Sequence, residues 1–373
     1  MKIAVNTRLL INDIHGGIEW FSYECLKRIC SGHPEHDFIF LFDRPYEKKF
    51  IFSSNIEPHV VKPATIHPLF WYIWLEYKIP QVLRKTGADL FLSPDGMMPL
   101  RTNIPCIPVI HDINFYHRSH DLPRLKSLYY RKYFKLYARK ARRVVTVSEY
   151  SKQDMVRSWN IDPDKIDVVY NGAADEFSSI EYRHGIRDKK MAKPYFLFVG
   201  NLSPRKNAGK LILAYEKYRK EFSGTANLII AGDRLFMNRK TDRIYMNSEY
   251  KNDIHFVGKK SRDELRTLYS EAIALVFVPW FEGFGIPIVE AMKCGTAVIA
   301  SDTTSLPEIA GDAARFVSPS DTKAIAREML TVEKDEKLRK EMIRKGFLNS
   351  RKYTWDKTAD LLWQSIEKSL KQV

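Results

Sequence analysis

The 373-residue sequence predicts an α/β protein of two domains, each a doubly wound parallel sheet covered by helices on both faces. Three observations lead to this prediction: strand-like apolar runs alternate with helical patterns, one long polar stretch interrupts the alternation, and the alternation then starts again. The chain is long enough for two domains of ordinary size. Its 45% hydrophobic content can fill two cores.

The first half of the chain contains six short apolar runs that we expect to be strands. They are Ile3–Asn6, Phe38–Phe42, Asp89–Ser93, Ile107–Ile110, Val144–Val147 and Ile166–Tyr170. The stretch from Asn171 to about Lys193 is rich in charge and poor in large aliphatic residues. It predicts a boundary, with residues 1–185 in the first domain and 186–354 in the second.

The alternation resumes in the second half, at runs that begin at Tyr195 (YFLFVG), Asn227 (NLIIAG) and Ile254 (IHFVG). A further unit then follows: a strand-like run at Ile273–Pro279, a loop, the helical pattern IVEAMK and the apolar run TAVIAS from Thr296. The tail from Trp355 predicts an amphipathic helix.

The loop and helix of that last unit form the segment EGFGIPIVE, with Glu282 and Glu290 eight positions apart. Pro287 suits the start of a helix and Gly295 suits the position just after its end, which places Glu290 in the first turn. Glu282 then lies in the loop at the strand's carboxyl end, where open parallel sheets bind ligands. Two glycines let a ligand approach the backbone. The alternative is that Glu290 only complements the helix dipole.

The segment EGFGIPIVE is similar to the E-x7-E signature of the retaining glycosyltransferases of family 4. That family has the GT-B architecture, in which two Rossmann-like domains face a central cleft. The resemblance extends over nearly the whole chain, with the motifs GG, HD, PRKN, FVG and EGFGIPIVE in the expected order. It implies that the C-terminal helix, residues 355–373, crosses back to pack on the first domain.

The resemblance also implies roles for the residues of this segment. Glu282 would position the donor sugar through its hydroxyls, helped by the backbone N–H groups of Phe284, Gly285 and Ile286. Glu290 would bind the ribose hydroxyls of the donor.

Arg205 and Lys206, in the segment FVGNLSPRKNAGKLI, lie where a helix is expected to start near Asn207. The macrodipole disfavours cations at that end of a helix, so an anion between them would be stabilising. A diphosphate would meet that need, and the alternative is a solvated basic loop. In the family the matching Arg and Lys hold the donor diphosphate. Some relatives carry a further Arg where this chain has Asn201.

Three more residues are candidates for the ligand site. Val257, near the end of the strand-like run IHFVG, would lie beside the nucleotide base by resemblance. Gly17 belongs to a Gly-Gly turn before a helix, where a ligand can approach free N–H groups. His111 ends an apolar run, and the resemblance implies contact with the donor sugar, while Asp112 orients the neighbouring loop. For each of them the alternative is a purely structural role.

The net charge of +15 is concentrated between Leu125 and Arg143, where lysines and arginines alternate with aromatic residues. A second aromatic cluster lies at His67–Tyr77. Such segments suit an anionic membrane surface or, less well here, nucleic acid, because no recognised nucleic-acid motif is present. The third interpretation is a helix with core aromatics and solvated charges.

Several properties place limits on function. No uncharged apolar run is long enough to cross a bilayer, and the start MKIAVNTRLL suits a first strand better than a signal peptide. Cys25, Cys30, Cys106 and Cys294 show no metal-type spacing, so reduced thiols in a cytosolic protein are expected. No metal ligands are predicted, and Asp162-Pro-Asp164 is interpreted as a turn. No cofactor is expected.

The hypothesis is therefore a metal-independent hexosyltransferase that moves a sugar from a nucleotide diphosphate donor to a glycan or lipid-linked acceptor with retention. GDP-mannose is the first choice of donor, because the PRKN and HD variants resemble those of mannosyltransferases in surface polysaccharide synthesis. The expected location is the inner face of the cytoplasmic membrane, as a peripheral protein. The alternatives are a nucleotide-sugar epimerase or hydrolase on the same scaffold, and a catalytically silent carbohydrate- or membrane-binding protein.

Overall fold

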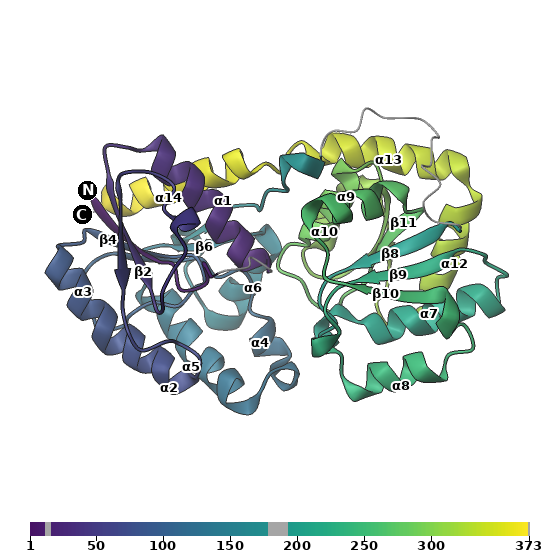
Figure 1. Ribbon diagram of the computed structural model, residues 1–373, viewed down its shortest axis with the longest axis horizontal. Helices are drawn as coiled ribbons and strands as arrows, with labels where there is room; N and C mark the ends of the chain where they lie inside the picture. The colour runs from purple at the N-terminus through teal and green to yellow at the C-terminus, as the bar shows by residue number, and fades with distance from the viewer. Residues whose placement is uncertain (12–15, 178–192, 372–373) are drawn as a thin grey trace. The chain divides into compact units, whose positions relative to one another are not determined.

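The computed structural model describes residues 1–11, 16–177 and 193–371, and its chain divides into two units (Figure 1). Unit 1 comprises Met1–Gly172 and Trp355–Val373, and unit 2 comprises Ala173–Thr354. Each unit is built on a parallel sheet, which confirms the predicted α/β class. The predicted boundary between residues 185 and 186 lies outside the described residues.

Unit 1 has a five-stranded parallel sheet in the order β3-β2-β1-β4-β5, with β6 and β7 paired beside it. A bridge between Val109 and Val145 joins the two parts. The strands are β1 (Lys2–Asn6), β2 (Asp37–Phe42), β3 (Ile56–Val60), β4 (Leu90–Ser93), β5 (Cys106–Pro108), β6 (Val144–Thr146) and β7 (Ile166–Val168). The helices are α1 (Gly17–Gly32), α2 (Pro68–Ile73), α3 (Ile79–Thr86), α4 (Asn114–His117), α5 (Arg124–Lys140), α6 (Glu149–Trp159) and α14 (Trp355–Lys371).

Unit 2 has a six-stranded parallel sheet in the order β10-β9-β8-β11-β12-β13. Successive strands are added on one side from β8 to β10 and on the other side from β11 to β13, so the strand order reverses between β8 and β11. The strands are β8 (Tyr195–Val199), β9 (Asn227–Ala231), β10 (Ile254–Gly258), β11 (Ala274–Phe277), β12 (Ala297–Ser301) and β13 (Ala314–Val317). The helices are α7 (Ala208–Lys220), α8 (Arg239–Asn247), α9 (Arg262–Glu271), α10 (Ile286–Lys293), α11 (Leu306–Ala310), α12 (Thr322–Lys334) and α13 (Glu336–Ser350). A reversal of this kind creates the crevice where open sheets bind ligands.

The central strands of unit 2 are buried on both faces, as parallel strands between helical layers must be. In β8, Phe196 and Phe198 belong to the core that also includes residues of α7 and α12. Tyr195 and Leu197 point the other way, into the core shared with α9 and α10. This burial explains why their sequences are continuous apolar runs.

Two strands, β3 and β13, were not predicted. Both lie at an edge of their sheet and are partly exposed, so neither is a continuous apolar run. β3 also contains Pro58, a residue that sheets accept mainly at an edge. The prediction failed here because edge strands bury less of their surface than central ones.

The C-terminal helix α14 packs on α1 within unit 1. The Trp363 ring stacks on His33 with 3.6 Å between ring centroids. Arg28 of α1 contacts Asp356 at 2.5 Å. Aromatic stacking and this ion pair hold the last helix on the first unit, although unit 2 separates them in sequence.

Candidate functional site

The EGFGIPIVE segment forms the loop between β11 and α10 at the carboxyl edge of the unit 2 sheet. Gly285 is the residue before the helix and has φ of 100°, which a side chain rarely tolerates. A Cβ atom there would also lie 2.6 Å from Leu306. The hydroxyl of Ser305 donates to the carbonyls of Glu282 and Phe284, at 3.0 and 3.1 Å. The loop therefore has one defined shape, and Ile286 opens the helix with an N–H that has no acceptor inside it.

Glu282 lies between the two cations that the sequence assigned to a diphosphate. Its Oε1 atom is 2.6 Å from Nη1 of Arg205 and 2.5 Å from Nζ of Lys206. Burial alone would raise the pKa of the Glu282 carboxyl, but the two positive charges outweigh burial and the pKa is lowered. The carboxylate therefore remains ionised at neutral pH and supplies the counter-charge for both cations.

The backbone around the two cations is joined to the Glu282 loop. The N–H of Trp280 donates to the carbonyl of Arg205 at 2.9 Å, and Nη1 of Arg205 donates to the carbonyl of Phe281 at 2.6 Å. Nζ of Lys206 lies 4.9 Å from the centre of the Phe277 ring. These contacts hold the cations in place against the end of β11.

The predicted start of a helix near Asn207 is confirmed, since α7 begins at Ala208 with Asn207 as its N-cap. Arg205 and Lys206 form a 3₁₀ turn, Pro204–Lys206, directly before it. Asn207 lies between the turn and the helix with φ of 62°, a conformation that Asn tolerates better than most residues. Its side chain donates to the carbonyls of Val278 and Pro319, at 2.8 and 2.9 Å. The cations thus precede the helix, and Asn207 anchors the turn to the loops after β11 and β13.

Glu290 lies in the second turn of α10 and not in the first turn as predicted, because the helix begins one residue before Pro287. α10 has no acidic residue in its first turn. Its Oε2 atom accepts a hydrogen bond from the Tyr269 hydroxyl of α9 at 2.8 Å. Burial raises the pKa of the Glu290 carboxyl, against the opposing effects of Tyr269 and nearby cations. Helix-dipole compensation therefore does not explain this residue. The end of α10 is as predicted, with Gly295 in the left-handed conformation after it.

Glycines line the carboxyl ends of the strands on the other side of the topological reversal. Gly200 follows β8, Gly232 follows β9 and Gly258 ends β10. A Cβ at Gly232 would lie 1.8 Å from the carbonyl oxygen of Gly200, so only glycine allows these backbones to meet. Val257 is half-buried at an irregularity in β10, next to Gly258 with φ of 71°. At these three strand ends the backbone therefore carries no side chain of its own.

Unit 1 contains the other two predicted residues, Gly17 and His111. Gly17 is the exposed first residue of α1, and Phe21 on the same helix contacts the His111 ring edge-to-face at 5.0 Å. Nε2 of His111 donates to the carbonyl of Pro94 at 2.8 Å, which makes Nδ1 the acceptor of the neutral ring. Burial lowers the pKa of His111. Asp112 accepts a hydrogen bond from the N–H of Asn114 at 2.9 Å, in agreement with its predicted loop-orienting role.

Sequence reasoning missed a buried polar cluster at the carboxyl edge of the unit 1 sheet. Arg8, two residues after β1, contacts Asp95, two residues after β4, at 2.6 Å. Asn6 donates to Asp95 at 2.9 Å, and Thr65 accepts from Arg8 at 3.4 Å. The signal was available, because charged residues just after two predicted parallel strands meet at one edge of the sheet.

Thr304 and Ser305 were also missed. Thr304 has φ of 59°, which is strained for a β-branched residue, and its hydroxyl accepts from the N–H of Glu282 at 3.3 Å. The signal was the run of hydroxyl residues that directly follows the predicted strand from Thr296. These residues shape the backbone that carries Glu282.

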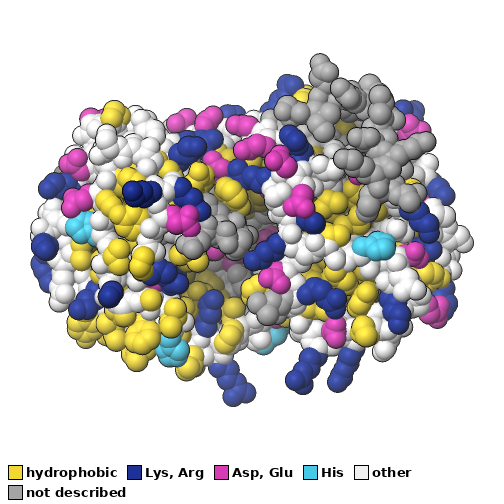
Figure 2. All heavy atoms as spheres, in the orientation of Figure 1, with side chains coloured by type: hydrophobic (Ala, Val, Ile, Leu, Met, Phe, Trp, Pro, Cys, Tyr) yellow, Lys and Arg dark blue, Asp and Glu magenta, His cyan; other side chains and the backbone are white. Residues whose placement is uncertain are grey.

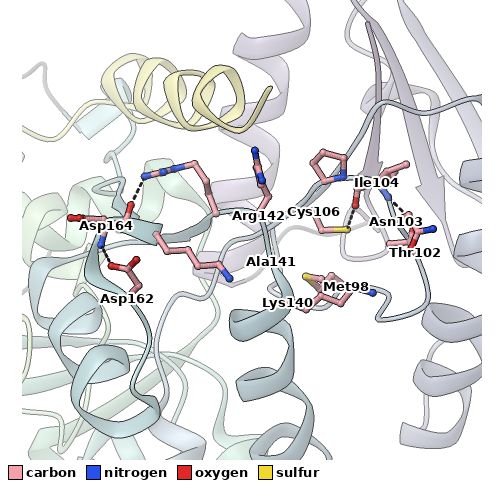
Figure 3. A pocket seen from close by; sticks show the side chains of 13 residues that line it. Met98, Thr102, Asn103, Ile104, Cys106, Lys140, Ala141, Arg142, Asp162 and Asp164 are labelled. Atoms are coloured by element: carbon pink, nitrogen blue, oxygen red, sulfur yellow. Dashed lines mark hydrogen bonds between the residues drawn. The ribbon is translucent and has the colours of Figure 1, made fainter. Parts of the chain in front are cut away.

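A separate pocket of about 850 Å³ lies in unit 1 at the start of β5, and none of the predicted site residues lines it (Figure 3). Three of the Lys and Arg side chains that line this pocket already bind other groups of the protein. Arg143 contacts Asp167 at 2.5 Å, Lys165 donates to the carbonyl of Arg139 at 2.6 Å, and Lys140 donates to the carbonyl of Leu100. Asp162 caps the 3₁₀ turn Pro163–Lys165, as predicted for a turn. The pocket is at the amino ends of the strands, so we do not assign it to the reaction.

The structure brings Arg205, Lys206, Glu282 and the 284–286 backbone together in unit 2, with Glu290 one turn along the same helix. Gly17 and His111 form a second group in unit 1, and the cleft predicted between the domains stays a prediction. The four cysteines are free thiols. The described residues include no set of three or more His, Cys, Asp or Glu side chains grouped as metal ligands. None of the helices described is both long and apolar enough to cross a bilayer.

Comparisons with known proteins address the family directly. A family model for glycosyltransferase family 4 matches residues 15–177, and one for glycosyl transferases group 1 matches residues 180–348. The O-antigen chain mannosyltransferase RfbU of Salmonella typhimurium is 31% identical over 271 residues, 72% of each chain. The O-antigen chain mannosyltransferase B of Escherichia coli is 27% identical over 278 residues, 74% of this chain and 73% of the relative.

Solved structures show the same fold. A sucrose-phosphate synthase from Thermosynechococcus elongatus matches with a TM-score of 0.81 at 16% identity and covers both chains completely. WaaG, a glycosyltransferase involved in lipopolysaccharide biosynthesis, matches with a TM-score of 0.71 at 14% identity, over 96% of this chain and 98% of WaaG. Together with the sequence relatives and the two parallel sheets, these matches show that the chain belongs to glycosyltransferase family 4 and is a glycosyltransferase of the GT-B fold.

Proposed function

We propose that this glycosyltransferase moves a mannosyl residue from GDP-mannose to a sugar hydroxyl of a glycan or lipid-linked acceptor, with retention, in surface polysaccharide synthesis. The observation that carries the proposal is the buried cluster of Arg205, Lys206 and Glu282 at the carboxyl edge of the unit 2 sheet. It combines charges for a diphosphate with a carboxylate for sugar hydroxyls. Mannose is supported by the names of two relatives, both O-antigen chain mannosyltransferases.

Arg205 and Lys206 hold the diphosphate in this proposal. Negative charge grows on the β-phosphate as the sugar leaves, so fixed cations beside it stabilise the transition state more than the ground state. The proposal therefore needs no metal ion and no cofactor. Activity that persists after treatment with EDTA is the expected result.

Glu282 exchanges partners when the donor binds. Its carboxylate now occupies the hydrogen-bonding positions of both cations, so incoming phosphate oxygens compete with it. Once displaced, it can accept hydrogen bonds from the sugar hydroxyls beside the N–H groups of Phe284, Gly285 and Ile286. Its lowered pKa makes it a poor base, so we assign it to positioning the sugar and not to proton abstraction.

The remaining predicted residues complete the donor site. Glu290 accepts from Tyr269 through Oε2 and takes the ribose hydroxyls through its other oxygen. Val257 and the bare backbone around it lie beside the base. Neutral His111 accepts a hydrogen bond from the sugar, and Gly17 allows phosphate or acceptor to approach the start of α1.

The setting that fits this reaction is the inner face of the cytoplasmic membrane, where a peripheral enzyme meets cytoplasmic donor and lipid-linked acceptor. The basic, aromatic segment from Leu125 to Arg143 supports an anionic membrane surface as a partner. Nucleic acid is not part of the proposal.

The test begins with thermal unfolding in the presence of GDP-mannose and of UDP-, ADP- and dTDP-sugars. GDP-mannose is expected to raise Tm most, and Lys206→Ala to abolish the shift. Lys210→Ala is the matched control, because it removes an equal charge from α7 four residues away and should keep the shift. The site assignment fails if no nucleotide sugar stabilises the protein, or if Lys206→Ala retains full turnover.

Product analysis then separates the competing activities. NMR of the anomeric proton in the product should show an α-linkage, the configuration of the donor. Consumption of GDP-mannose at the same rate without any acceptor would favour an epimerase or hydrolase instead. Tight donor binding with no product under any condition would favour a silent binding protein.

A further inference from the structure

Exposed apolar side chains are concentrated on one part of unit 1, where α2 meets α5. Leu125 and Leu128 of α5 are 62% and 63% exposed, and Leu69 of α2 is 57% exposed. We call the set the α2–α5 face, and its members are Ile66, Leu69, Phe70, Leu125 and Leu128. Single exposed apolar residues are ordinary, but five close together on a soluble surface usually indicate an interaction site.

Tertiary structure brings the two segments together, although more than 50 residues separate them in sequence. The buried Trp71 ring of α2 lies 5.3 Å from the Tyr129 ring and 5.6 Å from the Tyr130 ring of α5. These aromatic residues agree with the interpretation of both segments as helices whose aromatic side chains belong to the core. Leu69, Leu125 and Leu128 instead point to solvent.

The exposed charged residues on the helices of this face are basic. Seven of the 17 residues of α5 are Lys or Arg, and none is acidic. In α2 and the π-helical turn Trp74–Lys78 that follows it, the only acid is Glu76, which is buried and accepts from the N–H of Leu100 at 3.0 Å. Figure 2 shows hydrophobic side chains gathered at the lower left, over the area where Figure 1 labels α2 and α5, with Lys and Arg among them.

Lys126 lies within the face and has an unusual environment. Its Nζ atom is 5.3 Å from the centre of the Tyr130 ring and 5.9 Å from that of Trp71. No carboxylate lies within ion-pairing distance of it among the described residues. Burial and the Arg8 charge lower the pKa of Lys126. An ammonium group held over two rings between exposed leucines is well placed to meet a phosphate at the depth of lipid headgroups.

We propose that the α2–α5 face is a membrane-docking surface, which inserts its apolar side chains between the headgroups of an anionic phospholipid bilayer. Lys126 and the other cations of α5 then contact lipid phosphates. A second copy of the chain is a poorer occupant, because a two-fold contact would place the seven cations of one α5 close to those of the other. Nucleic acid is also poorer, because the exposed residues are mostly aliphatic and do not stack on bases.

This inference deepens the proposed function, since it rests on an acceptor carried by a lipid. Docking through α2 and α5 would bring the carboxyl edge of the unit 1 sheet to lipid-linked sugars. It would also explain why the charge of this glycosyltransferase is concentrated in α5.

Co-sedimentation with vesicles of phosphatidylglycerol and phosphatidylcholine tests the docking surface without donor or acceptor. The double variant Leu125→Ser/Leu128→Ser is expected to weaken binding at least tenfold, because each leucine loses its apolar burial. Phe347→Ser/Leu348→Ser is the matched control, since these α13 side chains are also exposed, at 40% and 49%, and binding should be unchanged. Lys132→Gln/Lys135→Gln should weaken binding about fivefold per charge.

Three results would overturn the proposal. The first is equal binding of all variants to the vesicles, and the second is equal binding to pure phosphatidylcholine, which would leave no role for the cations. The third is dimerisation that is lost in Leu125→Ser/Leu128→Ser, because a second copy would then cover this face. Failure of docking is distinguishable from failure of the proposed chemistry, because transfer to a water-soluble acceptor measures the chemistry alone and the leucine variants should retain it.

Discussion

Glu282→Gln is the substitution that tests the partner exchange at the donor site most directly. The amide keeps the size of the side chain but removes the charge that contacts Arg205 at 2.6 Å and Lys206 at 2.5 Å. If phosphates must displace this carboxylate, the variant should bind GDP more tightly than the natural protein. A purely structural glutamate would give the opposite result, because its loss would only loosen the site.

The magnitude follows from the contacts that GDP replaces. A hydrogen bond to a charged group contributes about 1.5–3 kcal/mol, and a glutamine would retain part of it as a neutral acceptor. We therefore expect GDP affinity to rise by about 1–2 kcal/mol, roughly five- to thirtyfold in Kd. The protein without nucleotide should lose about 1–3 kcal/mol of stability, because two largely buried cations lose their counter-charge.

Isothermal titration calorimetry with GDP measures the affinity, and turnover of GDP-mannose measures the catalytic cost. Transfer should fall by about 10²-fold, since the sugar loses a charged hydrogen-bond acceptor. Glu290→Gln should instead weaken GDP binding, because Glu290 contacts neither cation and its proposed role is to bind the ribose hydroxyls of GDP. Unchanged or weaker GDP binding by Glu282→Gln would refute the exchange.

Three further predictions concern stability. Gly285→Ala should lower the free energy of unfolding, measured in urea, by about 1–3 kcal/mol, because φ of 100° and a contact of 2.6 Å with Leu306 both oppose a side chain. An unchanged free energy of unfolding would mean that the loop adjusts to the added methyl group. Glu290 has a raised folded-state pKa, so the natural protein should lose stability as pH rises above the ordinary value of 4.5. Glu290→Gln should lack that decline in thermal unfolding scans between pH 4 and 7. Arg8→Met should cost about 3–5 kcal/mol of unfolding free energy, because Asp95 stays buried without its counter-charge; the double variant with Asp95→Asn should recover part of it, and a loss under 1 kcal/mol would contradict this.

Prediction succeeded where local signals coincided with burial. β8, β9 and β11 are continuous apolar runs because both of their faces are covered, and the α10 boundaries followed from Pro287 and Gly295. It failed for β3 and β13, whose exposed edges leave no such pattern. Glu290 was placed in the first turn because Pro287 was taken as the first helical residue, whereas α10 begins one residue earlier, at Ile286.

At the candidate site the sequence identified which residues to consider but not how they pair. Spacing and residue type were sufficient to select Arg205, Lys206 and Glu282. Their mutual contact was not predicted, since the sequence interpretation placed the cations on phosphate and the glutamate on sugar. Arg8 and Asp95 went unnoticed because they lie 87 positions apart in the sequence and only the order of strands in the sheet brings them together.

The sequence by itself determined the class of fold, the succession of strands and helices, and the identity of the residues with chemistry to offer. These depend on local periodicity, on turn residues and on charge, which neighbours in the chain decide. Tertiary structure decided that Glu282 holds two cations and that Leu69 and Leu125 share one exposed face. Such pairings depend on which strands lie side by side and which helices cover them, and those contacts arise only when distant segments pack together.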